Sequence, residues 1–412
     1  MKNPLVVEFQ CPQCGAPASL IETSRVFVCK YCHVKSYLIP RHAFQYVLPN
    51  RCPDNREAAY FPYWRFRGVL FICRYDYSIH SEVIDETMQA TPSEFFPGDL
   101  GSKIQLSKTR FTGPDTKGRI FPLTIRRNEA VAQLTARYPT DYHSQFVGTL
   151  DLIYAPFYVH DGTLYDGTYN KRVDEYWDQK IKMTKDVVAK FPPLASLQQH
   201  VKFIPVLCPH CGADTDCARD SYLLICKNCS SFWRPQWEGM KRLGLYYLPG
   251  NSDTAIYLPF WRVKADITRI QLDTYADLIK VANLFKPSRD DYARIDFHFW
   301  LPAFRISSHL YLQIAKRVTI VQPQGRLEQA MPDADAYPVT LPISEAVKST
   351  KTVLADFIRL PEINYPRLGG IGITPKHSKL IFLPFHAAGS EFVHPECKVR
   401  VSKRTLEHFR EN

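Results

Sequence analysis

The chain contains little glycine, and it lacks the short motifs by which several enzyme classes are recognised. Its 412 residues include only 18 glycines, which argues against a glycine-rich nucleotide-binding fold. There is no phosphate-binding loop, no nucleophile elbow and no His-Glu-x-x-His motif. The stretch Gly369-Gly-Ile-Gly is too short for a phosphate loop and has no following Lys-Ser or Lys-Thr. The sequence therefore predicts no enzymatic activity, although an active site assembled from distant loops would leave no local motif.

Long apolar segments are also missing. No stretch reaches the roughly 18 apolar residues that span a bilayer, and the first residues, MKNPLVVEFQ, do not resemble a secretory signal. We therefore expect a cytoplasmic protein without a transmembrane segment. A length of 412 residues with 45% hydrophobic content suits two or more globular domains.

The chain is basic, with 52 Lys and Arg against 41 Asp and Glu and a formal net charge of +11. The excess is spread over both halves of the sequence rather than gathered in a tail. Such a distribution favours solubility, and it also permits weak attraction to nucleic acid or to an anionic membrane surface.

Eight of the 12 cysteines form two copies of one pattern, 197 positions apart. In each copy, 14 residues separate two Cys-x-x-Cys pairs. The two sets are Cys11, Cys14, Cys29 and Cys32, and Cys208, Cys211, Cys226 and Cys229. Paired knuckles at this spacing are typical of zinc ribbons, in which four thiolates surround one ion. We therefore predict two structural Zn²⁺ ions, with iron in a rubredoxin-like site as the less favoured alternative.

The residues beside these cysteines fit a structural metal site. Gly15 and Gly212 follow the first knuckles, where a tight turn needs a positive φ. A redox dithiol is disfavoured, because four thiolates closed on one metal leave no attacking thiol. His33 and His210 are expected on the surface, and a supporting hydrogen bond to a ligand is the alternative. The remaining thiols have no counterpart between the copies and are expected to be buried or incidental: Cys52, Cys73, Cys217 and Cys397.

The repeat extends beyond the cysteines to four blocks in the same order. The blocks are CPQCGAP at 11 and CPHCGAD at 208, YFPYWRFRG at 60 and YLPFWRVKA at 257, FPLTIRRNEAV at 121 and YPVTLPISEAV at 337, and LIYAPFYVHDG at 152 and LIFLPFHAAGS at 380. The step between copies grows from 197 to 216 and then to 228, which predicts a tandem duplication whose second copy has longer loops. We expect zinc ribbon 1 at 1–40, a β-rich module at 41–200, zinc ribbon 2 at 201–238 and a second β-rich module at 239–412.

Each module is predicted to be strand-rich α+β with one main helix. Alternating apolar and polar residues indicate strands at 65–75 and 262–270. Asn128 is expected to cap a helix at 129–137, and Ser344 one at 345–358. Glu129 and Glu345 would then lie in first turns, where a carboxylate stabilises the helix dipole. Further predictions are a helix at 173–190 ended by Phe191-Pro-Pro, a hairpin at 160–167 and a short basic helix at 402–412.

A short phrase of proline followed by aromatic residues recurs through the chain. It occurs at Phe61-Pro-Tyr-Trp-Arg, Ala155-Pro-Phe-Tyr, Leu258-Pro-Phe-Trp-Arg, Leu301-Pro-Ala-Phe-Arg and Leu383-Pro-Phe-His. Proline suits an edge strand or the first residue of a strand, and the aromatic residues are expected to form core. The alternative is an aromatic platform for nucleic-acid bases, with Arg65, Arg262 and Arg305 as phosphate ligands.

Taken together, these phrases resemble a bacterial group of uncharacterised tandem zinc-ribbon proteins with LPFW-type aromatic–proline motifs. The second copy, at 208–395, carries CPxCG…CxxC, LPFWR, FWLPAFR, YPVTL…EAV and LIFLPF. The first copy has no clear counterpart of FWLPAFR. The resemblance covers most of the chain and implies metal binding and the fold, and it implies no reaction.

Three functions follow in order of preference. Duplication, closed metal sites and the missing catalytic motifs favour a non-enzymatic adaptor or scaffold that binds a protein partner. The basic charge and the aromatic–arginine phrases indicate nucleic-acid binding as the alternative. An enzyme whose site leaves no sequence motif is the third hypothesis.

Overall fold

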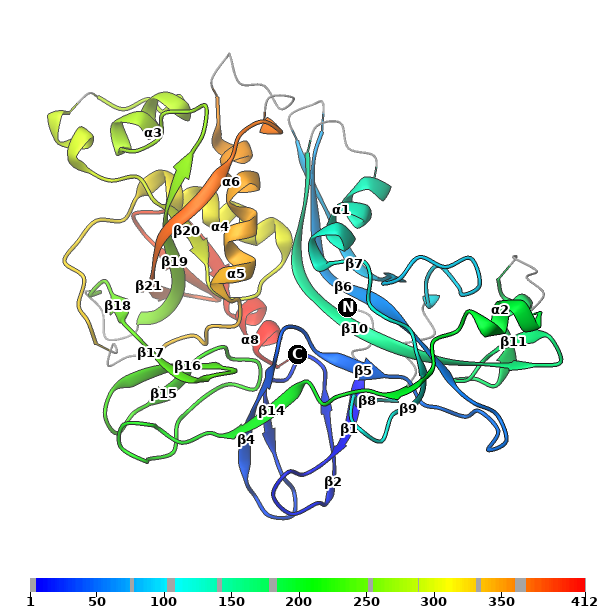
Figure 1. Ribbon diagram of the computed structural model, residues 1–412. Coiled ribbons are helices and arrows are strands. Elements are labelled where there is room, and N and C mark those ends of the chain that lie inside the picture. Colours follow the sequence, from blue (N-terminus) through cyan, green and yellow to red (C-terminus); the bar gives the residue numbers. More distant parts are fainter. Residues whose placement is uncertain are drawn as a thin grey trace.

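The computed structural model describes residues 5–74, 78–101, 108–138, 143–177, 184–250, 255–287, 289–330, 335–359 and 368–411. Strands predominate and helices are fewer, so the predicted α+β class is confirmed. Figure 1 shows two sheet-based halves side by side, with the cysteine-bearing segments below and between them. We call residues 1–200 the first half and residues 201–412 the second half.

The first half is built on one long antiparallel pair, β6 (Ala59–Cys73) with β10 (His143–His160). The main path of its mixed sheet is β13-β9-β6-β10-β5-β8-β1-β2, with β7 also on β6 and the β11–β12 hairpin on β10. The other strands of this sheet are β1 (Val6–Gln10), β2 (Pro17–Ile21), β5 (Gln45–Val47), β7 (Ile79–Gln89), β8 (Lys108–Phe111), β9 (Lys117–Ile120), β11 (Thr163–Asp166), β12 (Lys171–Arg172) and β13 (Leu194–Ser196). The predicted hairpin at 160–167 is the β10–β11 turn.

The second half repeats this plan with fewer strands. Its long antiparallel pair is β19 (Ala255–Ile267) with β21 (Ile373–Ala388), and the order is β20-β19-β21-β22-β23 with β18 on β21. The other strands are β18 (Leu245–Tyr247), β20 (Phe299–Pro302), β22 (Glu391–His394) and β23 (Val399–Ser402). In both halves a short strand pairs parallel with the last long strand, β5 with β10 and β18 with β21.

The two long strand pairs also share their register. Trp64 lies opposite Leu152 across β6 and β10, and Trp261 lies opposite Leu380 across β19 and β21. The tryptophans are 197 positions apart and the leucines 228, the steps seen in the sequence. Residues related by the sequence repeat therefore occupy the same places in the two strand pairs.

A hydrogen bond that occurs in both halves reproduces the remaining step of the sequence repeat, 216 positions. The indole N–H of Trp64 donates to the carbonyl of Ile125 at 2.9 Å, and that of Trp261 donates to the carbonyl of Leu341 at 2.9 Å. The two acceptors are 216 positions apart. Both indoles are buried, so each fixes a loop carbonyl against its sheet at the start of the following helix.

The structure also supplies the first-half counterpart of FWLPAFR. The amide of Ala90, after β7, donates to the carbonyl of Pro62 at 2.9 Å, and the amide of Ala303, after β20, donates to the carbonyl of Pro259 at 2.9 Å. The end of β7 therefore holds the place of β20. Sequence comparison misses it because TMQA at 87–90 and WLPA at 300–303 share only alanine.

The same contacts explain how proline is tolerated in β6 and β19. Both are central strands, whereas the sequence predicted that these prolines lie in edge strands or at the start of strands. Pro62 lies inside β6 and Pro259 inside β19. The N–H and C=O of one strand residue point to the same neighbour, and both prolines direct their carbonyls to the point where β7 and β20 end. The missing amides therefore face the end of a ladder, where no hydrogen bond is lost.

Helices cover the sheets, and several differ from prediction. α1 (Arg127–Arg137) begins after Arg126, so Asn128 lies inside the helix and does not cap it. Ser344 likewise lies inside α5 (Ile343–Ala346), which follows Pro342. The predicted helix at 345–358 is broken into α5, a 3₁₀ turn η4 (Val347–Ser349) and α6 (Thr350–Phe357). Glu129 and Glu345 do lie in first turns, as predicted.

The expectation of one main helix is wrong for the second half. α3 (Tyr275–Val281) and α4 (Ser308–Val321) follow β19 and β20. At 173–190 the described residues form a 3₁₀ turn, η2 (Val173–Glu175), and a short α2 (Lys185–Ala189), while 178–183 lie outside the described residues. Tyr176 leaves helical geometry with φ −135°, so the predicted continuous helix is wrong. α8 (Lys403–Glu411) confirms the short basic helix at the end of the chain.

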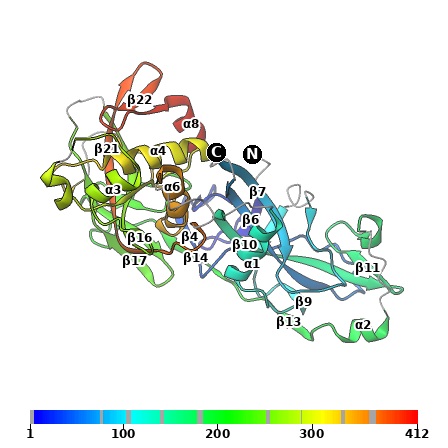
Figure 2. The ribbon, with the colours of Figure 1, turned by 90° about the horizontal axis from the view of Figure 1, so that it is seen from above.

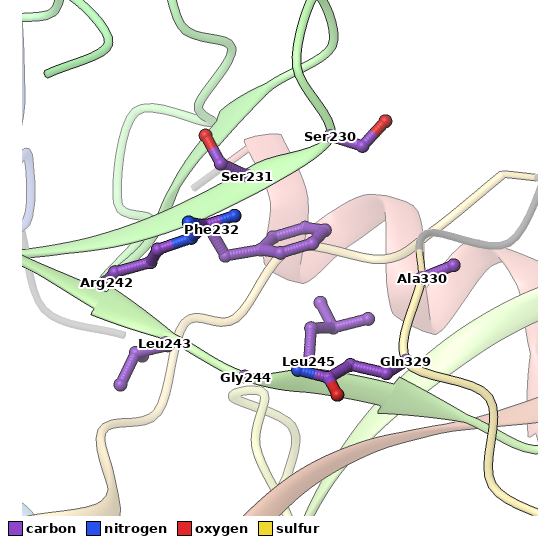
Figure 3. A pocket seen from close by; sticks show the side chains of 9 residues that line it. All are labelled: Ser230, Ser231, Phe232, Arg242, Leu243, Gly244, Leu245, Gln329 and Ala330. Atoms are coloured by element: carbon purple, nitrogen blue, oxygen red, sulfur yellow. The ribbon is translucent and has the colours of Figure 1, made fainter. Parts of the chain in front are cut away.

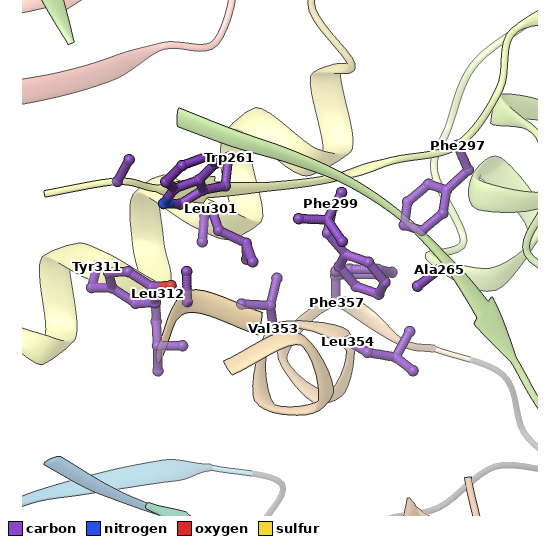
Figure 4. Packing of buried hydrophobic residues seen from close by; sticks show 14 of the residues in the cluster. Trp261, Ala265, Phe297, Phe299, Leu301, Tyr311, Leu312, Val353, Leu354 and Phe357 are labelled. Atoms are coloured by element: carbon purple, nitrogen blue, oxygen red, sulfur yellow. The ribbon is translucent and has the colours of Figure 1, made fainter. Parts of the chain in front are cut away.

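The faces of the two sheets are covered differently. In the first half, the ribbon packs on the face of Phe61 and Tyr63, and α1 packs on the opposite face with Trp64. In the second half, α6 packs on the face of Trp261, and Figure 4 shows its Val353 and Phe357 among strand and α4 side chains. The opposite face of the second sheet is covered by α4 and α8 instead of a ribbon.

The aromatic side chains of the proline phrases belong to these cores. Residues at no more than 6% exposure include Phe61, Tyr63, Trp64, Phe157, Phe260, Trp261, Phe304 and Phe385. They are therefore unavailable as an exposed stacking platform.

The ribbons have their own small sheets, and these join the two halves. The first sheet is β14-β4-β3 and the second is β15-β16-β17. Their strands are β3 (Val26–Val28), β4 (Lys35–Pro40), β14 (Val201–Pro205), β15 (Leu224–Cys226), β16 (Ser231–Gln236) and β17 (Gly239–Leu243). Residues 201–205, assigned from sequence to ribbon 2, thus pair with ribbon 1. In Figure 2, viewed from above, β4, β14 and β16 lie between the two sheets.

The paired indole hydrogen bonds make a test of stability. Trp64→Phe and Trp261→Phe each remove one donor and leave a carbonyl without its partner, so each should lower the free energy of unfolding by about 1–3 kcal/mol. Chemical denaturation followed by circular dichroism measures this. Phe285→Leu is the control, because the Phe285 side chain is fully exposed; variants as stable as this control would contradict the assigned role.

Candidate metal centres

The first knuckle of each ribbon is a tight turn closed by backbone hydrogen bonds. The Gly15 amide donates to the Cys11 carbonyl at 2.9 Å, and the Gly212 amide donates to the Cys208 carbonyl at 2.9 Å. Gly15 has φ 72° and Gly212 has φ 75°, as the sequence predicts. A Cβ at these positions would meet open space, so glycine is required for its backbone conformation rather than for room.

The second knuckles reach the same conformation without glycine. His33 has φ 58° and Ser230 has φ 48°, and the His33 amide donates to the Cys29 carbonyl at 3.1 Å. These residues are 197 positions apart. The shared feature of His33 is therefore its left-handed backbone, which sequence reasoning missed. The His33 and His210 side chains are exposed, in agreement with the surface interpretation.

The four thiols of each ribbon converge on one point. In the first set, Cys11 Sγ lies 3.8 Å from Cys32 Sγ, and Cys14 Sγ lies 3.7 Å from Cys29 Sγ. All four sulfurs lie within 4.8 Å of one another. Zn–S bonds of about 2.3 Å place the corners of a tetrahedron about 3.8 Å apart. The spacing therefore fits one tetrahedral ion and is far too long for disulfides.

The second set repeats this geometry. Cys208 Sγ lies 3.6 Å from Cys229 Sγ, and Cys211 Sγ lies 3.5 Å from Cys226 Sγ. One ligand of each pair is buried and the other more exposed. Each ribbon could thus hold an ion at its rim, with two of the four thiols buried in the core.

Hydrogen bonds support the ionised form of several thiols. Burial acts to raise the pKa of Cys208, but hydrogen bonds from Ser231 and from backbone amides lower it to about 5. The Asn228 side-chain amide, 3.4 Å from Cys211 Sγ, lowers the pKa of that thiol. In the first set, backbone amides of Cys32 and Tyr31 lower the pKa of Cys29 to about 6.

Other thiols of the same sets shift in the opposite direction. Burial and the neighbouring thiols raise the pKa of Cys226 to about 12. Four adjacent thiolates repel one another, so a bare set cannot ionise completely. A dication removes this conflict, and the donor set is therefore suited to Zn²⁺ held by all four sulfurs.

The chemistry of such sites is structural. Four sulfur ligands complete a tetrahedral zinc and leave no position for water or substrate. In the part of the chain that the structure describes, these tetrads are the only groups of three or more metal-ligating side chains close enough to share an ion. Cys52 and Cys217 are half-buried, and burial raises the pKa of Cys73 to about 11 and that of Cys397 to about 12. These four thiols join neither tetrad.

The two ribbons pack against each other beside the metal centres. A buried cluster joins Val26 and Tyr37 of the first ribbon to Cys208, Cys226 and Trp233 of the second. Ligands of the second site therefore form part of the core shared by the ribbons, so loss of that ion should loosen the contact between the halves.

One arginine marks this contact. Arg25 donates to the hydroxyl of Tyr222 at 2.9 Å, and its guanidinium lies 4.9 Å from the Tyr222 ring centre and 4.7 Å from that of Phe44. Arg25 and Tyr222 are 197 positions apart, so they hold the same place in the two ribbons. Comparison of the copies could have shown them as corresponding residues, but not as partners.

Two cavities adjoin the ribbons. The first, of about 510 Å³, lies beside the second ribbon, and Figure 3 shows Phe232 and Leu245 within it and Arg242 as its one charged side chain. The second, of about 540 Å³, lies between the halves. Its charged side chains are Arg25, Arg41, Arg127, Asp151, Arg234, Glu238 and Glu345. Among the described residues, neither lining brings three metal-ligating side chains close enough to share an ion.

Removal of one ligand tests the second centre. Cys226→Ser should lower bound zinc by one equivalent per chain and destabilise the second half, because the free energy of structural zinc binding contributes to folding. Zinc analysis and thermal unfolding measure the two effects. Cys217→Ser is the matched control, because Cys217 lies nearby but outside the tetrad. Unchanged zinc content in Cys226→Ser would refute the site.

No helix among the described residues has the length and apolar character needed to cross a bilayer. Comparison of the chain with protein-family models, with curated proteins and with solved structures gives no match.

Proposed function

We propose that the protein is a non-enzymatic adaptor or scaffold whose two modules are held by structural zinc and bind a protein partner. The observation that carries the proposal is that two ribbons, each with a closed four-cysteine site, pack against each other. Because all four positions of each ion are filled by sulfur, the metal shapes surfaces and performs no chemistry. The protein is expected to act in the cytoplasm, where thiols remain reduced and available to metal.

The modules are proposed to be tandem copies. The support is the shared register of the long strand pairs and the matched indole hydrogen bonds. Zinc is preferred to iron because the ions fill closed ribbons with no need for redox change. Purified protein should contain about two zinc ions per chain and lack the visible absorption of iron–thiolate centres.

Nucleic-acid binding is the second candidate. It is favoured by the net charge of +11 and by exposed basic residues on β21, among them Lys376 and Lys379. Burial of the aromatic phrases removes one part of the argument for it, since base stacking needs accessible rings. It predicts affinity for DNA or RNA that falls steeply with salt.

Partner capture tests the adaptor proposal directly. Full-length protein is cross-linked at physiological salt and recovered by affinity, and it should retain a defined partner protein. The amount of captured partner should fall with Cys226→Ser and stay the same with Cys217→Ser. Fluorescent DNA and RNA, titrated at low salt, test the second candidate in the same preparation. A monomeric elution profile with no captured protein would contradict the adaptor function.

A further inference from the structure

The first sheet carries a buried charge network on the face that ribbon 1 covers. Arg65 and Arg67 project from β6, and Glu22 of the ribbon lies 2.6 Å from each. Asp85 of β7 lies 3.1 Å from Arg65. Asp151 of β10 lies opposite Arg65 in the register and is also buried. Two cations therefore meet three carboxylates in the protein interior.

The second sheet keeps the cations and replaces the acids. By the steps of the repeat, Arg65 corresponds to Arg262 and Arg67 to Lys264. The register then pairs Arg262 with Lys379 where Arg65 pairs with Asp151. The remaining correspondences are Asp85 with His298 and Glu22 with Arg219. Each of the three carboxylates thus has a basic residue in its place.

Ribbon 2 does not cover this face, because it is placed elsewhere. The carbonyl of Arg219 accepts from the amides of Arg25 and Val26 at 2.7 and 3.0 Å, which holds that turn against ribbon 1. The turn that would correspond to the Glu22 turn is therefore directed away from β19. β21 is exposed from Thr374 to Lys379, so the outer part of the face is open.

Two donors on this face have no protein partner among the described residues. They are Nε of Arg262 and Nε1 of Trp300, both of which are buried. The Arg262 guanidinium lies 5.8 Å from the Trp300 ring centre, and the Trp300 side chain is 1% exposed. Buried donors normally find an acceptor. In the first half the corresponding guanidinium, that of Arg65, donates four hydrogen bonds to the carboxylates of Glu22 and Asp85.

Neighbouring charges leave this site positive. Lys264 contacts Asp296 at 3.3 Å, but Asp296 is 74% exposed. Lys379 lies over the Tyr246 ring at 5.1 Å. Burial and the nearby Arg262 lower the pKa of His298 to about 4, so this imidazole is neutral at pH 7. Among the described residues, Asp296 is the acidic side chain paired with one of the three cations Arg262, Lys264 and Lys379.

We propose that Arg262, Lys264 and Lys379 form a docking site for a carboxylate side chain on an acidic segment of a protein partner. The proposal rests on the adaptor function and names the chemistry of its partner. The first half shows what this face accepts, since there Glu22 bridges the equivalent cations. The partner's carboxylate would pair with the accessible part of the half-buried Arg262 guanidinium, and an arginine–carboxylate pair would give it direction.

A protein carboxylate is favoured over nucleic acid by the rings at the site. Trp300 is buried and the Tyr246 ring is occupied by Lys379, so no free aromatic face is offered to a base. The equivalent first-half contact is made by a carboxylate on a turn rather than by an extended anionic chain.

The test uses the full-length zinc-loaded protein and a fluorescent hexaglutamate peptide at low salt. Arg262→Gln should weaken binding at least about fivefold, because it removes a charge-assisted hydrogen bond. Lys379→Asp should abolish binding, because it restores the acid that faces the arginine in the first half. Lys376→Gln removes the same charge from the same strand, where Lys376 is paired with Asp266 at 2.6 Å, and it should leave affinity nearly unchanged.

Zinc content and thermal unfolding confirm that each variant is folded. Equal losses in Lys376→Gln and Arg262→Gln would show non-specific attraction and overturn the proposal, as would absence of hexaglutamate binding. An oligothymidylate that displaces the peptide and depends on Arg262 would assign the face to nucleic acid instead. If Lys379→Asp captures as much partner as the unchanged protein, the adaptor function is retained but this site is not where the partner binds.

Discussion

Each half of the molecule depends on one long antiparallel strand pair, and the other elements are attached to it. β6 with β10 and β19 with β21 bury their apolar side chains on both faces. Such pairs need cover on both sides, because exposed apolar faces of this size are costly in water. The Trp64 and Trp261 indoles fix the cover on one face by binding the loop before the helix. The opposite face is covered by different elements in the two halves.

The halves differ in how they cover that second face. In the first half ribbon 1 lies on it, and the buried charges there are matched by Glu22. In the second half α4 and α8 cover the apolar part, and ribbon 2 packs with ribbon 1 instead. Ribbon 1 lies on its own sheet and also contacts ribbon 2, whereas the Arg219 turn of ribbon 2 is held against ribbon 1. The outer part of the second sheet is therefore not covered by ribbon 2, and Arg262 has no carboxylate in the place that Glu22 takes beside Arg65.

The sequence predicted the parts that are encoded by spacing. Cysteine tetrads, positive φ at Gly15 and Gly212, core aromatic residues and the strand-rich class all follow from local patterns, and the structure agrees. The predicted first residues of the helices were wrong. Asn128 and Ser344 are favourable capping residues by type, but the helices begin earlier, directly after the loops that the indoles bind. The 197-position step related Arg25 to Tyr222, but only the packing of the ribbons makes them partners. The ion pair of Arg65 with Asp85, which lies diagonally across β6 and β7, could not be found without the register.

The proposed docking site accounts for the half-buried Arg262, which has no counterpart of Glu22 beside it. A half-buried arginine whose buried Nε has no acceptor is costly, and the first half shows that the sheet can supply acids from β7, from β10 and from the ribbon turn. In the second half the three corresponding positions are Arg219, His298 and Lys379, and Arg262 lies on the strand in the place of Arg65. If this face had no ligand, replacing Arg262 by an uncharged residue would increase the stability of the fold. The presence of Arg262 beside Lys379 and Lys264 fits the proposed site, in which an anion from another molecule takes the place that Glu22 fills in the first half.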